Sequence, residues 1–146
     1  MKAIMYHYVQ PFNKNFQYFK NLDIKDFKKQ LDYLDNEYGI ISKEEFLSYF
    51  NNKNQKDIKK GVVLTFDDGL SCHYDFVFPE LKRRNLWGIF YISTLPYTKN
   101  KFLDVHKTHI LLGRINSKKV YDYLKKIINE EIFDREKLEE FKKFTY

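Results

Sequence analysis

Two adjacent carboxylates stand at the end of an apolar run in the middle of this sequence. Residues 65–69 read Thr-Phe-Asp-Asp-Gly, and residues 61–66 are almost entirely apolar. On an extended backbone, neighbouring side chains such as Asp67 and Asp68 point to different sides, so one can bind a metal ion while the other faces a water molecule. Gly69 permits the tight turn that follows. The same pentapeptide also fits a plain turn in which Asp and Gly only satisfy backbone geometry.

Histidines are natural partners of such a pair at a metal ion. His106 and His109 are three residues apart, so on a helix over residues 103–113 both imidazoles share one face and suit a single ion. The spacing equally fits a polar or half-buried helix face without a ligand. His7 stands near the end of the first predicted strand, where it can line the same end of a sheet as the carboxylates or hydrogen-bond within its own loop. His73 directly follows the acidic turn, and we interpret it as structural or exposed.

The elements that must position these residues alternate between strands and helices. Strands are predicted at residues 3–9, 61–66 and 87–92. Helices are predicted between them, at residues 23–38, 42–50 and 78–84. This order favours right-handed βαβ units and a parallel sheet or barrel.

The first two helices have recognisable boundary signals. Asp23 can cap the first helix, and Gly39 stands where the chain must leave it. Ser42 with Glu45 three residues later is a capping-box pattern for the second helix.

Beyond residue 102 the pattern changes to helix alone. Apolar side chains recur at three- and four-residue spacing over residues 103–113, 117–130 and 135–144. Asn116 and Asp134 are the expected caps. We therefore predict one α/β domain over residues 1–146, with an α/β part at 1–94 and a helical part at 102–146.

Four segments in order resemble a known family. They are Met5-Tyr6-His7, the stretch 62–69, Pro79-Glu80-Leu81 and the stretch 88–92. Together they look like the polysaccharide deacetylase family, also called the NodB homology domain or carbohydrate esterase family 4. The match covers about residues 3–94, and Thr-Phe-Asp-Asp-Gly is its most specific element. The resemblance implies a partial or distorted (β/α) barrel of the polysaccharide deacetylase type, followed here by the helical C-terminal segment.

The resemblance also implies a reaction and roles for residues. A divalent metal, usually zinc (Zn2+), would lie at the mouth of the barrel, with Asp68 as a ligand and His106 and His109 as candidates for the other ligands. Asp67 would be the catalytic base that takes a proton from metal-bound water. The reaction would be hydrolysis of an acetamide or acetate ester on an acetylated carbohydrate. We expect His7 and Tyr97 to contact the substrate.

The sequence departs from the family pattern in its second half. Two residues rather than three separate His106 from His109, and no histidine follows His109. The last proline is Pro96, so the family's later Arg-x-x-Pro segment has no counterpart. The chain is then either the front portion of a longer protein or a divergent relative with a helical insertion. We expect an incomplete deacetylase with low activity alone, and the alternative is a non-catalytic carbohydrate-binding remnant of the same fold.

Composition limits the other classes of function. The net charge of +6 comes from 26 basic and 20 acidic side chains, with lysines spread along the chain. Clusters such as Lys82-Arg83-Arg84 suggest nucleic-acid binding, but basic and acidic side chains nearly balance over residues 114–146, so we expect no nucleic-acid partner.

The cellular location is predicted from the low cysteine content and from the absence of targeting and membrane-spanning patterns in the sequence. The single cysteine, Cys72, allows no intramolecular disulfide or cysteine zinc cluster. The sequence shows no signal-peptide pattern and no apolar stretch of membrane-spanning length. We expect a cytoplasmic location with no transmembrane segment, and the oligomeric state stays open.

Overall fold

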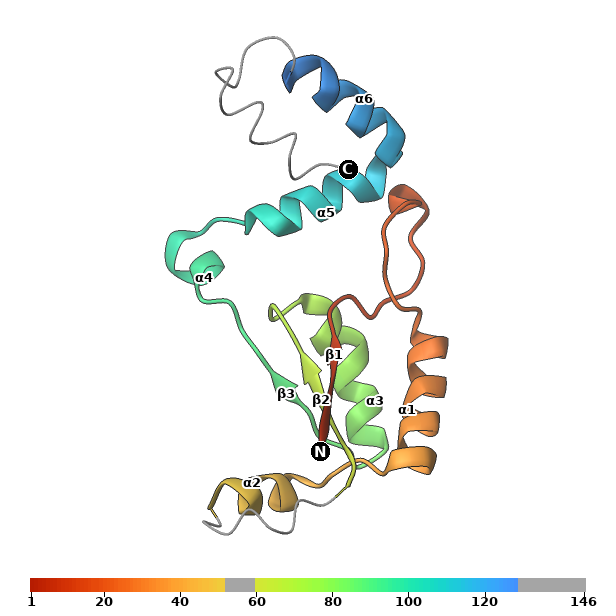
Figure 1. The fold of residues 1–146 in the computed structure, drawn as a ribbon, viewed down its shortest axis with the longest axis vertical. Coiled ribbons are helices and arrows are strands. Elements are labelled where there is room, and N and C mark those ends of the chain that lie inside the picture. Colours follow the sequence, from red (N-terminus) through yellow and green to blue (C-terminus); the bar gives the residue numbers. More distant parts are fainter. Residues whose placement is uncertain (52–59, 129–146) are drawn as a thin grey trace. The chain divides into compact units, whose positions relative to one another are not determined.

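The computed structural model describes residues 1–51 and 60–128 (Figure 1). The chain divides into two compact units. One comprises Met1–Asn13 and Lys20–Leu103, and the other comprises Lys14–Phe19 and Asp104–Tyr146. The helix expected at 135–144 and its cap Asp134 lie outside the described residues. The prediction of one domain over residues 1–146 stays a prediction.

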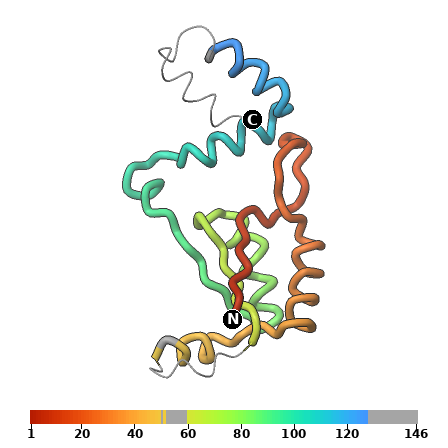
Figure 2. Tube along the Cα trace, in the orientation of Figure 1, coloured from red at the N-terminus to blue at the C-terminus, as the bar shows by residue number. Residues whose placement is uncertain are grey.

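A three-stranded parallel sheet forms the centre of the first unit. Its order is β1 (Lys2–Tyr6), β2 (Val62–Phe66) and β3 (Ile89–Phe90). The pairing aligns Tyr6 with Phe66 and Phe66 with Phe90, and the trace in Figure 2 shows β1 and β2 side by side. All five residues of β2 are buried, as expected for a central parallel strand. The predicted parallel sheet is confirmed, whereas the barrel is not shown, because the described part of the chain contains only these three strands.

The third strand is shorter and more exposed than the sequence indicates. The apolar run predicts a buried strand at 87–92, but β3 is only two residues long. Phe90, Tyr91 and Ile92 are 36%, 55% and 60% exposed. The prediction of burial is wrong here because β3 is an edge strand, with β2 as its only partner among the described residues.

The helix boundaries follow the local signals. The helix α1 (Ile24–Tyr38) begins after Asp23, whose side chain accepts a hydrogen bond from the Lys25 amide, and it ends at Gly39 with φ of 73°. The helix α2 (Lys43–Asn51) has both bonds of the capping box: the Ser42 amide donates to Glu45 Oε2, and the Glu45 amide donates to Ser42 Oγ. These predictions are confirmed.

Two helical segments around the third strand differ from expectation. The helix α3 (Phe78–Arg83) is present as predicted, but a π-helix at His73–Val77 precedes it. A short helix, α4 (Leu95–Lys99), follows β3. Neither segment has a periodic apolar pattern long enough to be recognised in the sequence.

Helices α1 and α3 cover one face of the sheet (Figure 1). The core between them joins buried side chains of β1, β2, α1, the π-helix and α3: Tyr6, Phe27, Leu31, Leu34, Val62, Leu64, Phe66, Val77 and Leu81. The Tyr6 ring packs against both Phe27 and Phe66, with centroid distances of 5.2 and 5.4 Å. This core holds the end of β1 against the end of β2, where the carboxylate pair begins.

The second unit is helical in its described part. It contains a short 3₁₀ helix (Lys14–Phe16), α5 (Asp104–Arg114) and α6 (Ser117–Ile128), and Asn116 caps α6 as predicted by accepting from the Lys118 amide. The Tyr18 amide donates to the Gly113 carbonyl at 3.0 Å. A Cβ at Gly113 would lie 2.6 Å from the Phe19 ring, so this close packing requires glycine. Across residues 1–51 and 60–128, no helix has the length and apolar character needed to cross a membrane.

Candidate active site

The carboxylate pair lies at the carboxyl end of the central strand. Asp67 and Asp68 directly follow β2, and His7 directly follows β1. The sheet pairing continues to this point, since the Asp67 amide donates to the Tyr6 carbonyl at 3.0 Å and the Tyr91 amide donates to the Phe66 carbonyl at 2.8 Å. Ligands of parallel α/β sheets bind at the carboxyl ends of the strands. The structure therefore places the acidic residues where such a fold builds its sites.

The turn after the strand has an unusual backbone. Asp68 and Gly69 both adopt positive φ, at 74° and 59°. A side chain at position 69 would also meet Ile92, because a Cβ there would lie 3.2 Å from Ile92 Cγ2. A left-handed conformation at a residue other than glycine is uncommon and costs free energy, and such residues gather at functional sites.

His7 lies against both carboxylates. Its Nε2 is 4.0 Å from Asp67 Oδ2 and 3.8 Å from Asp68 Oδ2. The three side chains are between 23% and 39% exposed, so water and a ligand can reach them. Of the two interpretations of His7, the one that lines this end of the sheet matches the geometry. Its role in binding substrate stays a prediction.

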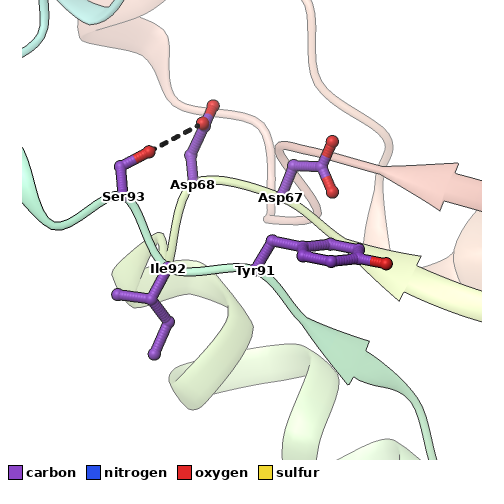
Figure 3. A pocket seen from close by; sticks show the side chains of 5 residues that line it. All are labelled: Asp67, Asp68, Tyr91, Ile92 and Ser93. Atoms are coloured by element: carbon purple, nitrogen blue, oxygen red, sulfur yellow. Dashed lines mark hydrogen bonds between the residues drawn. The ribbon is translucent and has the colours of Figure 1, made fainter.

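A hollow of about 400 Å³ opens beside the pair, lined by Asp67, Asp68, Tyr91, Ile92 and Ser93. The Ser93 hydroxyl donates to Asp68 Oδ1 at 3.4 Å. Figure 3 shows the two carboxylates and this hydroxyl on one side of the strand ends, with the Ile92 side chain directed the other way. Sequence reasoning missed Tyr91 and Ser93. The end of the apolar run at residue 92 could have indicated Ser93, whereas Tyr91 lies within the strand predicted at 87–92.

The Asp67 and Asp68 charges affect two further titratable side chains, Tyr8 and His73. Burial raises the pKa of the Tyr8 hydroxyl, and the negative charge of Asp68 raises it further, so Tyr8 remains a hydrogen-bond donor at neutral pH. His73 is 3% exposed, which excludes the exposed interpretation, and its Nε2 lies 2.6 Å from the His7 carbonyl oxygen. Burial lowers the pKa of the His73 imidazole and favours its neutral form.

The other predicted site residues lie elsewhere in the chain. His106 and His109 are on α5 in the second unit, three residues apart and both half-buried. Tyr97 is on α4, is 71% exposed, and lines a separate hollow of about 340 Å³ with Asn100 and Phe102. The roles of these three residues stay predictions.

Carboxylate oxygens and imidazole nitrogens are ligand atoms that suit zinc. However, the described residues include no group of three or more His, Cys, Asp or Glu side chains gathered closely enough to hold a metal ion. The residues seen around Asp68 therefore do not form a complete metal site by themselves.

Comparison with known proteins relates this arrangement to deacetylases. No family model matches the chain, and no curated protein matches it. Among solved structures, a de-N-acetylase from Aggregatibacter actinomycetemcomitans is similar, with 26% identity, a TM-score of 0.54, and coverage of 69% of this chain and 41% of that protein. The Streptococcus pyogenes deacetylase PplD, solved in complex with acetate, is similar at 27% identity and a TM-score of 0.52, with coverage of 67% and 45%. The chain has a deacetylase-like fold and spans less than half the length of either protein.

Proposed function

We propose that this chain carries the acetyl-hydrolysing site of a carbohydrate deacetylase. One observation supports this most directly: Asp67 and Asp68 lie side by side at the carboxyl end of β2, with His7 Nε2 within about 4 Å of both. The similarity to two deacetylases supports the reaction class. The substrate in this proposal is an acetylated carbohydrate, with the acetyl group on nitrogen or on oxygen.

Asp67 is the proposed general base. Its carboxylate accepts a proton from a water molecule in the hollow, and the water oxygen forms a bond to the acetyl carbon. The bond from that carbon to the sugar nitrogen or oxygen then breaks. The proton that Asp67 took from water passes to the sugar nitrogen or oxygen as it leaves, and acetate is the second product.

The other proposed roles extend the predictions from the sequence. Asp68 is proposed as a ligand of a divalent metal, with Zn2+ the best candidate. That His106 and His109 supply further ligands stays a prediction from the sequence. When bound, such an ion supplies Lewis acidity, which makes water more acidic and an acetyl carbonyl more electrophilic. His7 and Tyr97 are proposed to contact the carbohydrate.

Acetate release and metal content test the proposal together. We would purify the chain without chelators, supply zinc, and measure acetate released from acetylated oligosaccharides and metal bound per chain. Three variants accompany the wild type: Asp67→Asn, Asp68→Asn and, as a matched control, Asp75→Asn, whose carboxylate is exposed on the π-helix.

The variants separate the two proposed carboxylate roles. We expect Asp67→Asn to keep the metal and lose turnover, Asp68→Asn to lose both, and Asp75→Asn to keep both. We expect low turnover from this chain alone. Binding of oligosaccharide with no detectable acetate release in the wild type would contradict the proposal and favour a carbohydrate-binding protein.

A further inference from the structure

A second histidine is buried directly behind the carboxylate pair. His73 is the first residue of the π-helix that follows the acidic turn, and it is 3% exposed. Its ring packs edge-on against both Phe66 and Phe90, with centroid distances of 5.6 and 6.0 Å. Short π-helical segments are rare and frequently stand at functional sites. Polar side chains that are buried to this degree are usually hydrogen-bonded to the protein.

The polar contact of His73 is with the main chain of His7. The distance from His73 Nε2 to the His7 carbonyl oxygen is 2.6 Å. A carbonyl oxygen can only accept, so Nε2 must carry the hydrogen, and the neutral ring is then the Nε2–H tautomer. Its Nδ1 is buried and has no hydrogen-bond partner among the described residues. The contact with His7 is therefore the one polar interaction seen for this ring.

The segment after β1 depends on this bond. Three successive carbonyls there each accept one hydrogen bond, and each donor comes from a different part of the chain. The Tyr6 carbonyl accepts from the Asp67 amide at 3.0 Å, and the Tyr8 carbonyl accepts from the Leu22 amide at 2.9 Å. The carbonyl between them belongs to His7, and its observed donor is a side chain rather than a backbone amide. Loss of that donor would leave a partly buried carbonyl without a partner.

We propose that His73 is a positioning residue for the candidate active site. Its Nε2–H holds the His7 main chain against the segment that carries Asp67 and Asp68, and this keeps the His7 ring within about 4 Å of both carboxylates. His73 touches neither carboxylate in any contact seen here, so it acts through His7. The effect on turnover rests on the proposed function, whereas the hydrogen bond does not.

Three variants separate positioning from core packing. His73→Leu removes the donor and keeps the apolar bulk, and His73→Gln keeps an N–H donor of similar reach. Val77→Ala is the control, because Val77 is fully buried in the same π-helix and belongs to the core cluster rather than to the His7 contact. For each variant we would measure kcat and KM for acetate release, with the thermal midpoint of unfolding.

The expected pattern distinguishes the two roles. Misplaced reacting groups cost on the order of tenfold to a hundredfold in rate. His73→Leu should lower kcat by about that factor, His73→Gln should recover most of it, and Val77→Ala should lower the midpoint of unfolding while keeping kcat. Equal kcat values for His73→Leu and Val77→Ala would overturn the proposal.

Imidazole nitrogen NMR provides a readout that needs no turnover. The wild type should show His73 as the Nε2–H tautomer, and the His7 ring signals should shift in His73→Leu and return in His73→Gln. An Nδ1–H tautomer at His73, or His7 signals unchanged in His73→Leu, would overturn the proposal. If wild type releases no acetate but these signals appear as expected, the proposed function fails and the positioning role stands.

Discussion

The first unit contains two acidic clusters with contrasting surroundings. Glu80 on α3 is 5% exposed, and two arginines hold it: Arg83 Nη2 and Arg84 Nε each lie 2.6 Å from Glu80 Oε1. Lys28 on α1 adds a third cation at 3.5 Å, and Arg84 also pairs with Asp32 of that helix. Guanidinium donors lower the pKa of the Glu80 carboxyl to about 2, against the opposing effect of its burial. This cluster ties α3 to α1.

The Asp67–Asp68 pair is about one quarter exposed and faces a hollow. Two of its contacts are longer: the Ser93 hydroxyl lies 3.4 Å from Asp68 Oδ1, and His7 Nε2 lies 4.0 Å from Asp67 Oδ2. The Glu80 carboxylate thus links two helices of the fold, whereas the Asp67–Asp68 pair borders a hollow that a ligand can enter.

The largest expected effect is a loss of acetate release when the Asp67 carboxylate of the Asp67–Asp68 pair is removed. Asp67→Asn should lower the rate of acetate release by about 10²- to 10⁴-fold, because the proposed general base is lost. The free energy of unfolding should change by less than ~0.5 kcal/mol, since this side chain is partly exposed. Steady-state kinetics and urea titration would measure the two quantities. Full activity in Asp67→Asn would remove Asp67 from the mechanism.

Removal of the Glu80 carboxylate, which Arg83, Arg84 and Lys28 surround, should instead lower the stability of the fold. Glu80→Gln removes the charge that three cations share, and breaking a buried ion pair costs about 3 kcal/mol. Turnover per folded molecule should stay at the wild-type value. Urea titration would measure the change, with Glu37→Gln on the exposed surface of α1 as the control. A stable Glu80→Gln protein with reduced turnover would reverse the roles assigned to the two clusters.

Acid should weaken the same cluster in a defined pH range. The Glu80 pKa lies near 2 in the folded chain, below its ordinary value of 4.5. The unfolded chain therefore binds this proton first as pH falls, and the stabilisation present above pH 4.5 is lost progressively toward pH 2. The loss should be about 2 kcal/mol, reduced by the exposure of Arg83 to water. Unfolding free energies of wild type and Glu80→Gln should converge over this range, and parallel pH profiles would contradict the assignment.

The smallest expected effect is on kcat/KM, when the Ser93 hydroxyl beside Asp68 is removed. Ser93→Ala removes a neutral hydroxyl whose hydrogen bond to Asp68 is long, at 3.4 Å. Such a bond contributes about 0.5 to 1 kcal/mol, so kcat/KM should fall by about two- to fivefold with little change in stability. A loss of a hundredfold or more would show that Ser93 contacts the reacting groups.

The sequence by itself determined the features that depend on near neighbours along the chain. The Asp23 cap, the exit at Gly39 and the reciprocal bonds of Ser42 and Glu45 each join residues at most five positions apart. The burial of β2 also follows from its continuous apolar run. The carboxylate pair at the end of this strand was recognisable for the same reason, through a short contiguous motif.

Only the tertiary structure decided which distant residues meet. His7 reaches Asp67 and Asp68 because β1 pairs in parallel with β2, and His73 reaches His7 because the chain returns through a π-helix. Phe90 has the same apolar character as Phe66, yet one is 36% exposed and the other is fully buried. Periodicity and composition report on local preference, whereas pairing and burial depend on contacts between segments far apart in the chain.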